Sequence, residues 1–271
     1  MNNTSNRLPT LFIPHGGGPC FFMDPSLWPP RMWESMELFL RGLPLKLGHL
    51  PKALICISAH WETPRTTVNG NPHPPMLFDY FGFPEHTYEL TYPAPGSPAL
   101  AMQVQMLLGK AGVPSDCELS RGFDHGVFVP FLLIYPRAQI PIVQLSLRAD
   151  LDPAAHLEVG RALAPLRDEG VLIVGSGMSY HNTAAMREVH EGDVSERFDV
   201  WLTATVEDAD VQRRERSLTD WENAPHARAC HPRSEHLAPL FVAAGAAMGD
   251  RGRRTYSDRI GNHAISAFQF G

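Results

Sequence analysis

The 271-residue sequence is poor in cysteine, and the four cysteines that it has are scattered. None of them forms a C-x-x-C pair, which argues against a zinc ribbon and against a thioredoxin-like redox motif. Cys56 lies inside an aliphatic run and is predicted to be a small buried hydrophobic residue. Unpaired cysteines of this kind fit a reducing cytoplasm.

The sequence also lacks long apolar runs. No stretch of about 18 consecutive apolar residues occurs, so no membrane-spanning helix is predicted. The first ten residues, MNNTSNRLPT, do not show the basic-then-apolar order of a signal peptide. We therefore expect a cytoplasmic protein with no membrane partner, whose residues 1–8 are flexible.

Positive charge is not in excess. The chain has 23 Lys and Arg against 29 Asp and Glu, which gives a formal net charge of −6. A nucleic-acid-binding surface needs clustered Lys and Arg, and only the segments QRRERS and RGRR are locally basic. We interpret both segments as solvated surface and expect no nucleic-acid partner.

What is present is the pattern of a layered α/β protein. Short aliphatic runs predict strands at Thr10–Pro14, Ala53–Ser58, Ile140–Leu145 and Val171–Gly175. Amphipathic periodicity predicts helices at Pro98–Gly112, Pro153–Asp168, Glu196–Glu207 and Ser234–Met248. Because apolar strands alternate with helices, we predict a single domain over residues 1–271 with a mostly parallel central sheet flanked by helices.

The proline-rich segment at residues 72–98 interrupts this alternation. It contains several Phe and Tyr residues, which flexible linkers rarely do. We therefore predict a long but structured excursion from the sheet.

Five of the thirteen histidines stand in a suggestive context. His15 and His60 follow predicted strands, and His181 follows a strand and a glycine-rich turn. His125 lies in GFDHGVFVP, between two predicted elements, and His236 lies in the first turn of the last helix, where Ser234 is a plausible N-cap. Ligands of parallel α/β sheets bind beyond the carboxyl ends of the strands, so these side chains are predicted to form a metal or catalytic cluster there.

The other eight histidines lack such a context, and surface or structural roles are predicted for them: His49, His73, His86, His156, His190, His226, His231 and His263. Of these, His73 and His86 lie in the proline-rich excursion and could also line a site. Imidazole suits Zn(II), Fe(II), Cu and Ni, so the type of ligand alone does not identify the metal.

Several well-known catalytic motifs are missing. There is no H-E-x-x-H, no G-x-S-x-G and no phosphate-binding G-x-x-x-x-G-K-[ST]. The segment HGGGP has the look of an esterase oxyanion loop, but no nucleophile elbow accompanies it. The chemistry that remains is metal-centred, with the additional histidines as acid and base.

Five segments carry a resemblance: PTLFIPHGGGP, ICISAHWETP, RGFDHGVFVPFLLIYPRAQIPIVQLSL, VGSGMSYHN and CHPRSEHLAPLFVAAGAA. Their order resembles the class III extradiol ring-cleaving dioxygenases. Within them, the chain is most similar to the 4,5-DOPA dioxygenase type, which is related to the protocatechuate 4,5-dioxygenase catalytic subunit. The resemblance extends through nearly the whole chain.

The resemblance implies a site and a reaction. It implies a non-haem Fe(II) bound by His15, His60 and His236, with Zn(II) as an alternative occupant after purification. It also implies an acid–base role for His181 and a place in the substrate pocket for His125. The substrates would be a catechol and O2, the protein a monomer or homodimer, and the substrate-contacting residues Trp61, Asp79, Phe83 and Ser176.

Two features leave alternatives open. Phe128 stands where many similar sequences look as though they carry Trp, and His73 and Met76 are unusual, so the ring substrate can differ from DOPA. The rival interpretation is a same-fold zinc- or copper-binding module, or a metal-dependent hydrolase, without oxygenase activity. The presence of both His181 and His125 beside a metal favours the dioxygenase.

Overall fold

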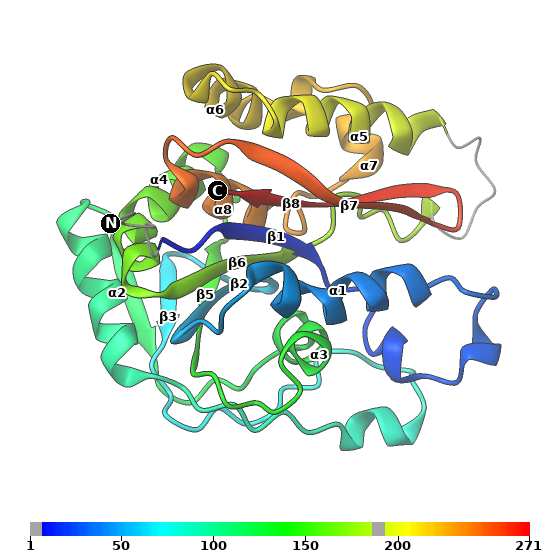
Figure 1. Ribbon diagram of the computed structural model, residues 1–271, viewed down its shortest axis with the longest axis horizontal. Coiled ribbons are helices and arrows are strands. Elements are labelled where there is room, and N and C mark those ends of the chain that lie inside the picture. The colour runs from blue at the N-terminus through cyan, green and yellow to red at the C-terminus, as the bar shows by residue number, and fades with distance from the viewer. Residues whose placement is uncertain (1–6, 186–192) are drawn as a thin grey trace.

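The computed structural model describes residues 7–185 and 193–271 and shows an eight-stranded sheet with helices packed on both faces (Figure 1). The strand order is β4-β3-β5-β2-β6-β1-β8-β7. The strands are β1 Thr10–Pro14, β2 Ala53–Thr63, β3 Thr66–Asn69, β4 Ser115–Glu118, β5 Ile142–Arg148, β6 Val171–Gly177, β7 Gly252–Ile260 and β8 His263–Phe270. The helices are α1 Glu34–Leu47, α2 Pro98–Lys110, α3 His125–Ile134, α4 Pro153–Leu163, α5 Asp193–Val206, α6 Val211–Thr219, α7 Ala227–Cys230 and α8 Ala238–Ala247.

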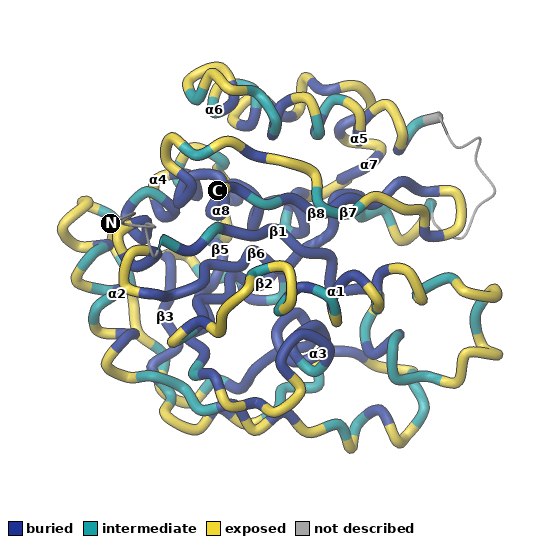
Figure 2. Tube along the Cα trace, viewed as in Figure 1, coloured by how far each residue is buried: buried dark blue, intermediate teal, exposed yellow. Residues whose placement is uncertain are grey.

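The centre of the sheet is parallel, as predicted. Strand β2 pairs in parallel with β5 and β6, and β6 pairs in parallel with β1. The C-terminal hairpin β7–β8, which the sequence did not suggest, extends the sheet in antiparallel fashion beyond β1. Figure 2 shows the buried residues running along the central strands and through α3 and α8. The fold class is therefore a single α/β domain with a buried central sheet.

The residues of strand β6 point alternately toward two layers of the protein, since successive strand residues point to opposite faces of a sheet. A Cβ built on Gly175 would lie 2.4 Å from the carbonyl oxygen of Pro239, and one on Gly177 would lie 2.1 Å from that of His236. These two glycines thus face the start of α8. Ser176, between them, points the other way and bonds to the carbonyl of Gly126 in α3.

The glycines of β6 have a structural purpose. Only a residue without a side chain allows the backbone around His236 to approach the strand so closely. The amide of Met178 then donates to the carbonyl of His236 at 3.0 Å, which fixes the two segments side by side. The segment VGSGMS, whose first four residues belong to β6, is therefore the surface on which the chain that carries His236 packs.

Strand β2 contains a pronounced bulge. Ile57 pairs with Leu145 and Glu62 with Leu147, so between these two pairs the chain advances five residues along β2 but only two along β5. The predicted strand ended at Ser58, whereas the observed one continues through His60 to Thr63. His60 thus lies within a distorted strand and not after its end. Bulges of this kind change the direction in which a side chain points.

Two helix predictions need correction. Residues 125–134 form α3, which the sequence did not predict, because nine of its ten residues are buried and the helix has no polar face to give an amphipathic period. Helix α8 begins at Ala238 and not at Ser234. The side chain of Ser234 caps nothing, and Pro239 sets the start of the helix, which leaves His236 in the turn before it.

The proline-rich excursion is structured, as predicted. It contains a short 3-10 helix, Glu85–Glu89, and it pairs with the chain before α3 through Met76 and Phe123. Its aromatic residues pack on α3, with ring centroids 5.7 Å apart for Phe78 and Phe128. The excursion therefore forms a wall beside the start of α3.

Two predictions concern residues at or beyond the limits of what the structure describes. Residues 1–6, expected to be flexible, and His190 lie outside the described residues. Leu8, in contrast, is buried, and its amide donates to the carbonyl of Arg167 at 3.1 Å.

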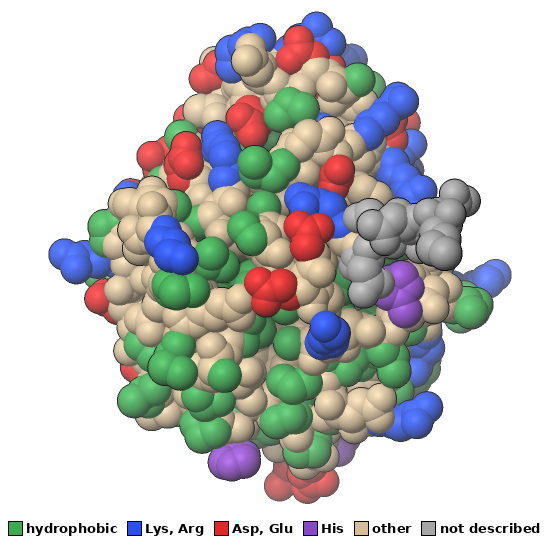
Figure 3. Space-filling view, turned by 60° about the vertical axis from the view of Figure 1, so that its left-hand side comes forward, with side chains coloured by type: hydrophobic (Ala, Val, Ile, Leu, Met, Phe, Trp, Pro, Cys, Tyr) green, Lys and Arg blue, Asp and Glu red, His purple; other side chains and the backbone are tan. Residues whose placement is uncertain are grey.

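The surface agrees in part with the sequence analysis. None of the described helices combines the length and the apolar character needed to cross a bilayer. On the face shown in Figure 3, basic and acidic side chains are interspersed. Arg253 and Arg254 of RGRR are exposed on β7, as predicted. Arg214 of QRRERS is instead buried and donates to the carbonyl of Met248, because it satisfies the end of α8.

His156 has the structural role predicted for it. It is buried, its Nδ1 donates to the carbonyl of Asp152 at 2.7 Å, and its Nε2 accepts from the amide of Arg148 at 3.1 Å. This pair of bonds joins the end of β5 to the start of α4. A neutral ring is required, because a second proton would face the amide of Arg148.

We therefore predict a pH-dependent contribution of His156 to stability. Burial lowers the pKa of His156 below its ordinary value of 6.5, so its contribution is complete above pH 6.5 and is lost as the pH falls below it. The free energy of unfolding should decrease in acid, by at most about 1.4 kcal/mol per pH unit from this group. In urea titrations, His156→Gln should show a shallower pH dependence than the wild type, and equal slopes would contradict the assignment.

Candidate metal centre

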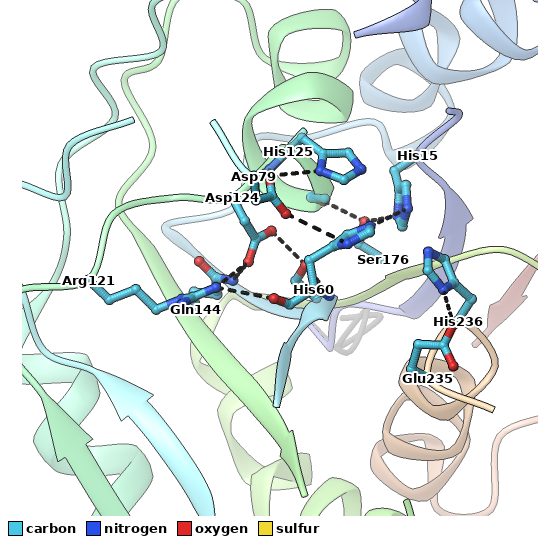
Figure 4. A network of polar contacts seen from close by, with 12 residues as sticks. His15, His60, Asp79, Arg121, Asp124, His125, Gln144, Ser176, Glu235 and His236 are labelled. Carbon is cyan, nitrogen blue, oxygen red and sulfur yellow. Dashed lines mark hydrogen bonds and ion pairs between the residues drawn. The ribbon is translucent and has the colours of Figure 1, made fainter. Parts of the chain in front are cut away.

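The five histidines selected from the sequence lie together at the carboxyl ends of the central strands (Figure 4 shows four of them). The ring centroids are 4.9 Å apart for His15 and His60, 5.3 Å for His15 and His236, and 4.9 Å for His60 and His236. One ligand atom from each of these three lies within 4.8 Å of the other two. His125 lies 3.8 Å from the ring of His60, and His181 lies 3.3 Å from the ring of His236.

His15 directly follows β1 and is buried. Its Nδ1 lies 3.0 Å from the hydroxyl of Ser176, and that hydroxyl donates its own hydrogen to the carbonyl of Gly126. Because the hydroxyl hydrogen is already used, His15 must donate from Nδ1. Its Nε2 is then left with a free lone pair that points to the cluster.

His60 comes from the bulge of β2. Its amide is bonded to the hydroxyl of Ser58 at 3.2 Å, and its Nδ1 lies 3.6 Å from Asp79 Oδ2. Its Nε2 lies 3.0 Å from Nε2 of His15. The bulge thus turns His60 so that its outer nitrogen meets that of His15.

His236 and His181 share one carboxylate. Glu235 Oε1 accepts from His236 Nδ1 at 2.9 Å and lies 3.1 Å from His181 Nδ1. The two rings are stacked with an angle of 17° between their planes. Because both Nδ1 atoms face the same oxygen, both Nε2 atoms are free on the other edge of the stack.

His125 opens α3 and is held by Asp79 of the excursion. Asp79 Oδ1 accepts from the amide of His125 at 2.9 Å and from its Nδ1 at 2.8 Å. The histidine is buried beside Tyr80, whose ring centroid lies 5.8 Å away. Asp79, predicted from the sequence to contact substrate, is therefore in direct contact with a histidine of the cluster.

Electrostatics favour neutral rings at the three convergent positions. Burial lowers the pKa of His15 and of His236 well below the usual value, and the neighbouring histidines lower it further. Burial and the charge of His125 lower the pKa of His60 to about 3. Protonation is thus disfavoured at each ring, and Nε2 of His60 and Nε2 of His15 face each other at 3.0 Å, with the tautomer of His60 deciding whether one donates to the other.

This donor set fits a divalent metal ion. A cation among the three rings would accept one nitrogen lone pair from each, and neutral imidazole is a ligand for Zn, Fe, Cu and Ni. The Nδ1 bonds to Ser176 and Glu235 are those that usually orient metal-ligating histidines. His15, His60 and His236 are thus the all-histidine group that could hold the ion; His60, Asp79 and His125, and likewise His181, Glu235 and His236, are also close enough together to do so.

A second buried network, made of hydrogen bonds around Asp124, holds the bulge of β2 in place. Asp124 accepts from the Ser58 hydroxyl at 2.6 Å, from Arg121 at 3.0 Å and from the amide group of Gln144. Burial raises the pKa of Asp124, the nearby charge of Asp79 raises it further, and these bonds act in the opposite direction. The network links β5, α3 and the bulge, so that His60 has a fixed backbone.

The other predicted site residues lie near the cluster but outside it. Trp61 is buried, and the guanidinium of Arg121 lies 4.7 Å from the centre of its ring. Phe83 packs on Gly18 of the loop that follows His15, where an added Cβ would lie 2.9 Å from the Phe83 ring. Ser176 is fully buried and is engaged with His15 and Gly126. Substrate contact by these residues stays a prediction.

Sequence reasoning missed Glu235 and Asp124. Both immediately precede a selected histidine, in the dipeptides Glu235–His236 and Asp124–His125. Glu235 contacts the ring of its neighbour, whereas Asp124 points away from the ring of His125 toward Ser58. Their position next to a selected histidine was a signal that could have identified both carboxylates, but this signal does not show which of the two orients a histidine ring.

Comparison with protein families and known proteins identifies relatives over almost the full length. Residues 12–269 match the family model described as the catalytic LigB subunit of aromatic ring-opening dioxygenase. A 4,5-DOPA dioxygenase extradiol of Beta vulgaris is 38% identical over 250 residues, which cover 91% of this chain and 90% of that protein. The Escherichia coli K12 protein of the same name is 35% identical and covers 90% of this chain and 86% of its own length.

Two further similarities extend the comparison. A fungal protein called dioxygenase tasH, from Hapsidospora irregularis, is 37% identical over 97% of this chain and 85% of its own. Among solved structures, an uncharacterised protein of Escherichia coli K12 superposes with a TM-score of 0.77 at 29% identity, covering 98% of this chain and 100% of that one.

The close packing of β6 against the turn before α8 yields a prediction about the metal centre. Gly177→Ala would force the carbonyl of His236 away from β6, because no Cβ fits at 2.1 Å from that oxygen. We expect a loss of about 1–3 kcal/mol in stability together with weaker binding of Co(II). The control is Gly109→Ala in α2, where an added Cβ meets nothing within 4 Å and Co(II) binding should not change. Equal Co(II) affinity in both variants would contradict the prediction.

Proposed function

The chain belongs to the family of catalytic LigB subunits of aromatic ring-opening dioxygenases, and we propose that it opens a catechol ring with O2 at a non-haem Fe(II) ion. Cleavage is extradiol, beside the two hydroxyl groups, and gives a muconic semialdehyde-type product. The observation that carries the proposal is the convergence of three neutral imidazoles with two further histidines beside them. Relatives named 4,5-DOPA dioxygenase extradiol support the same type of cleavage.

The metal is held by His15, His60 and His236. Bound there, Fe(II) would be chelated by the two catechol oxygens, lower the pKa of the hydroxyls and activate O2. Three protein ligands leave other coordination positions open for substrate. Zn(II) would bind the same neutral donors, since it stands high in the affinity series, and would replace Fe(II) during purification.

His181 moves the proton of the second catechol hydroxyl. Its Nδ1 faces Glu235 Oε1, so Nε2 is free to take the proton and to return it as the ring opens. The side chain is partly exposed, whereas His236 beneath it is buried, so His181 is reachable from the substrate side. An imidazole nitrogen can both accept and donate a proton, which suits transfer in both directions.

His125 and the excursion complete the substrate side. His125 is held at Nδ1 by Asp79, so Nε2 can accept a hydrogen bond from a hydroxyl on the substrate or oxygen side of the metal. The ring pocket is bounded by the Asp79–Pro84 stretch, including Phe83, with Trp61 and Ser176 supporting the metal side. The substrate is a catechol whose substituent fits this aromatic wall, and DOPA is one member of that class.

The function is tested by reconstitution with Fe(II) without oxygen, followed by oxygen uptake with catechols that carry different side chains. We expect oxygen consumption and a yellow product with the absorption of a muconic semialdehyde. A colourless cis,cis-muconate would show cleavage between the hydroxyls and contradict extradiol chemistry. No oxygen uptake with any catechol would favour the metal-dependent hydrolase or binding module instead.

Single substitutions separate metal ligands from the acid–base residue. His15→Ala, His60→Ala and His236→Ala should each lose bound Fe(II), because each removes one of three ligands. His181→Ala should retain Fe(II) and catechol binding but lose turnover by about 10²–10⁴-fold, the usual contribution of general acid–base catalysis. Metal content after dialysis and oxygen uptake measure the two effects, and exposed His73→Ala is the control. Loss of Fe(II) in His181→Ala would place His181 among the ligands.

A further inference from the structure

Two carboxylates stand on opposite sides of the histidine cluster. In Figure 4, Asp79 lies beside His125 and His60, and Glu235 lies beside His236. Each carboxylate contacts one histidine of the metal-binding set and one outside it. Asp79 contacts His60 and His125, whereas Glu235 contacts His236 and His181.

The contacts of Glu235 are concentrated on one oxygen. Oε1 is 2.9 Å from His236 Nδ1 and 3.1 Å from His181 Nδ1. Oε2 is buried and has no hydrogen-bond partner among the described residues, and Arg233 approaches it only to 3.7 Å. Arg233 itself is held by both carboxylate oxygens of Glu62. Among the described residues, the close contacts of the Glu235 carboxylate are therefore those of Oε1 with His236 and His181.

The contacts of Asp79 are unequal. Oδ1 accepts two hydrogen bonds from His125, one from the amide and one from Nδ1. Oδ2 lies 3.6 Å from His60 Nδ1, which is beyond the length of an ordinary hydrogen bond. His60 has a second support that does not involve Asp79, because the amide of His60 is bonded to Ser58. Asp79 thus holds His125 firmly and His60 weakly.

A carboxylate oxygen accepts hydrogen bonds but donates none when ionised. A histidine whose Nδ1 faces such an oxygen keeps its proton on Nδ1 and presents Nε2 as the lone-pair atom. The same bond also fixes the rotation of the ring. Glu235 therefore aligns a metal ligand and a proton-transfer residue at once, and the stacking of their rings keeps both Nε2 atoms on one edge.

We propose that Asp79 and Glu235 are positioning residues with different tasks, which builds on the dioxygenase function proposed above. Glu235 couples metal binding to proton transfer, because it orients the ligand His236 and the acid–base residue His181 through one oxygen. Asp79 acts on the substrate side alone, because it orients His125 and contributes little to the orientation of His60. Removal of either carboxylate lowers turnover, but only removal of Glu235 weakens the metal site.

The experiment uses Co(II) as a spectroscopic probe and does not depend on turnover. Glu235→Ala should raise the dissociation constant for Co(II) by about 10–100-fold, the usual effect of losing an orienting partner of a metal ligand. It should also change the visible bands of bound Co(II). Asp79→Ala should leave the dissociation constant within about threefold of the wild type and the bands unchanged. The control Glu62→Gln removes the other carboxylate on Arg233 and should leave Co(II) binding unchanged.

Kinetics at saturating Fe(II) complete the test. Both alanine variants should lose about 10–100-fold in kcat with little change in KM, because the acid–base and oxygen-side histidines act in chemistry more than in binding. The amide variants Asp79→Asn and Glu235→Gln keep an acceptor oxygen and should lie between wild type and alanine. If an alanine variant fails to fold by circular dichroism, its amide variant gives the same comparison.

The outcomes are distinct. Equal losses of Co(II) affinity in the two alanine variants, or wild-type affinity in Glu235→Ala, would overturn the division of tasks. If wild-type enzyme consumes no oxygen with any catechol, the proposed function fails, and the Co(II) titrations still decide whether Glu235 and Asp79 position the histidines as inferred.

Discussion

The structure depends on the oxygens that orient the clustered imidazoles, since four of the five rings have one within hydrogen-bond distance of Nδ1. Ser176 serves His15, Asp79 serves His125 and approaches His60, and Glu235 serves His236 and His181; the remaining nitrogens are Nε2 atoms that face one another. Burial lowers the pKa of the three convergent rings and so keeps them neutral. Neutral rings whose Nε2 atoms converge in this way could hold a cation, and the hydrogen bonds at Nδ1 turn those atoms toward one another.

Two of these rings are positioned by three consecutive residues of β6. Gly175 and Gly177 admit the turn that carries His236 on one face, and Ser176 receives His15 and the carbonyl of Gly126 on the other. A single strand segment thus holds two of the clustered histidines, one on each face of β6. The two glycines let the backbone around His236 approach β6, and Ser176 supplies a hydroxyl that accepts from His15. An ordinary strand residue could replace neither the glycines nor the serine.

Features that depend on neighbouring residues in the sequence could be predicted, whereas features that depend on contacts between distant segments could not. The parallel strands and the position of His15 after β1 follow from local apolar runs, which the sequence shows directly. Helix α3 escaped prediction because burial on all sides removes the periodic pattern on which such predictions depend. The roles of Asp79 and Glu235 could not be predicted, because they depend on which way a side chain turns. Asp79 is 46 residues away from the histidine that it holds.

The bulge of β2 has a consequence for the evolutionary history of such a site. Four residues lie between Ile57 and Glu62 but only one between Leu145 and Leu147, so β2 carries three extra residues. An in-frame deletion of that size would restore regular pairing of β2 with β5, and the pairs on either side of it would remain. The sheet would be inherited intact while the segment that presents His60 disappeared. A single small deletion could thus remove His60 from a related protein while the fold is inherited. Sequence similarity along the strands therefore does not guarantee that this histidine has been kept.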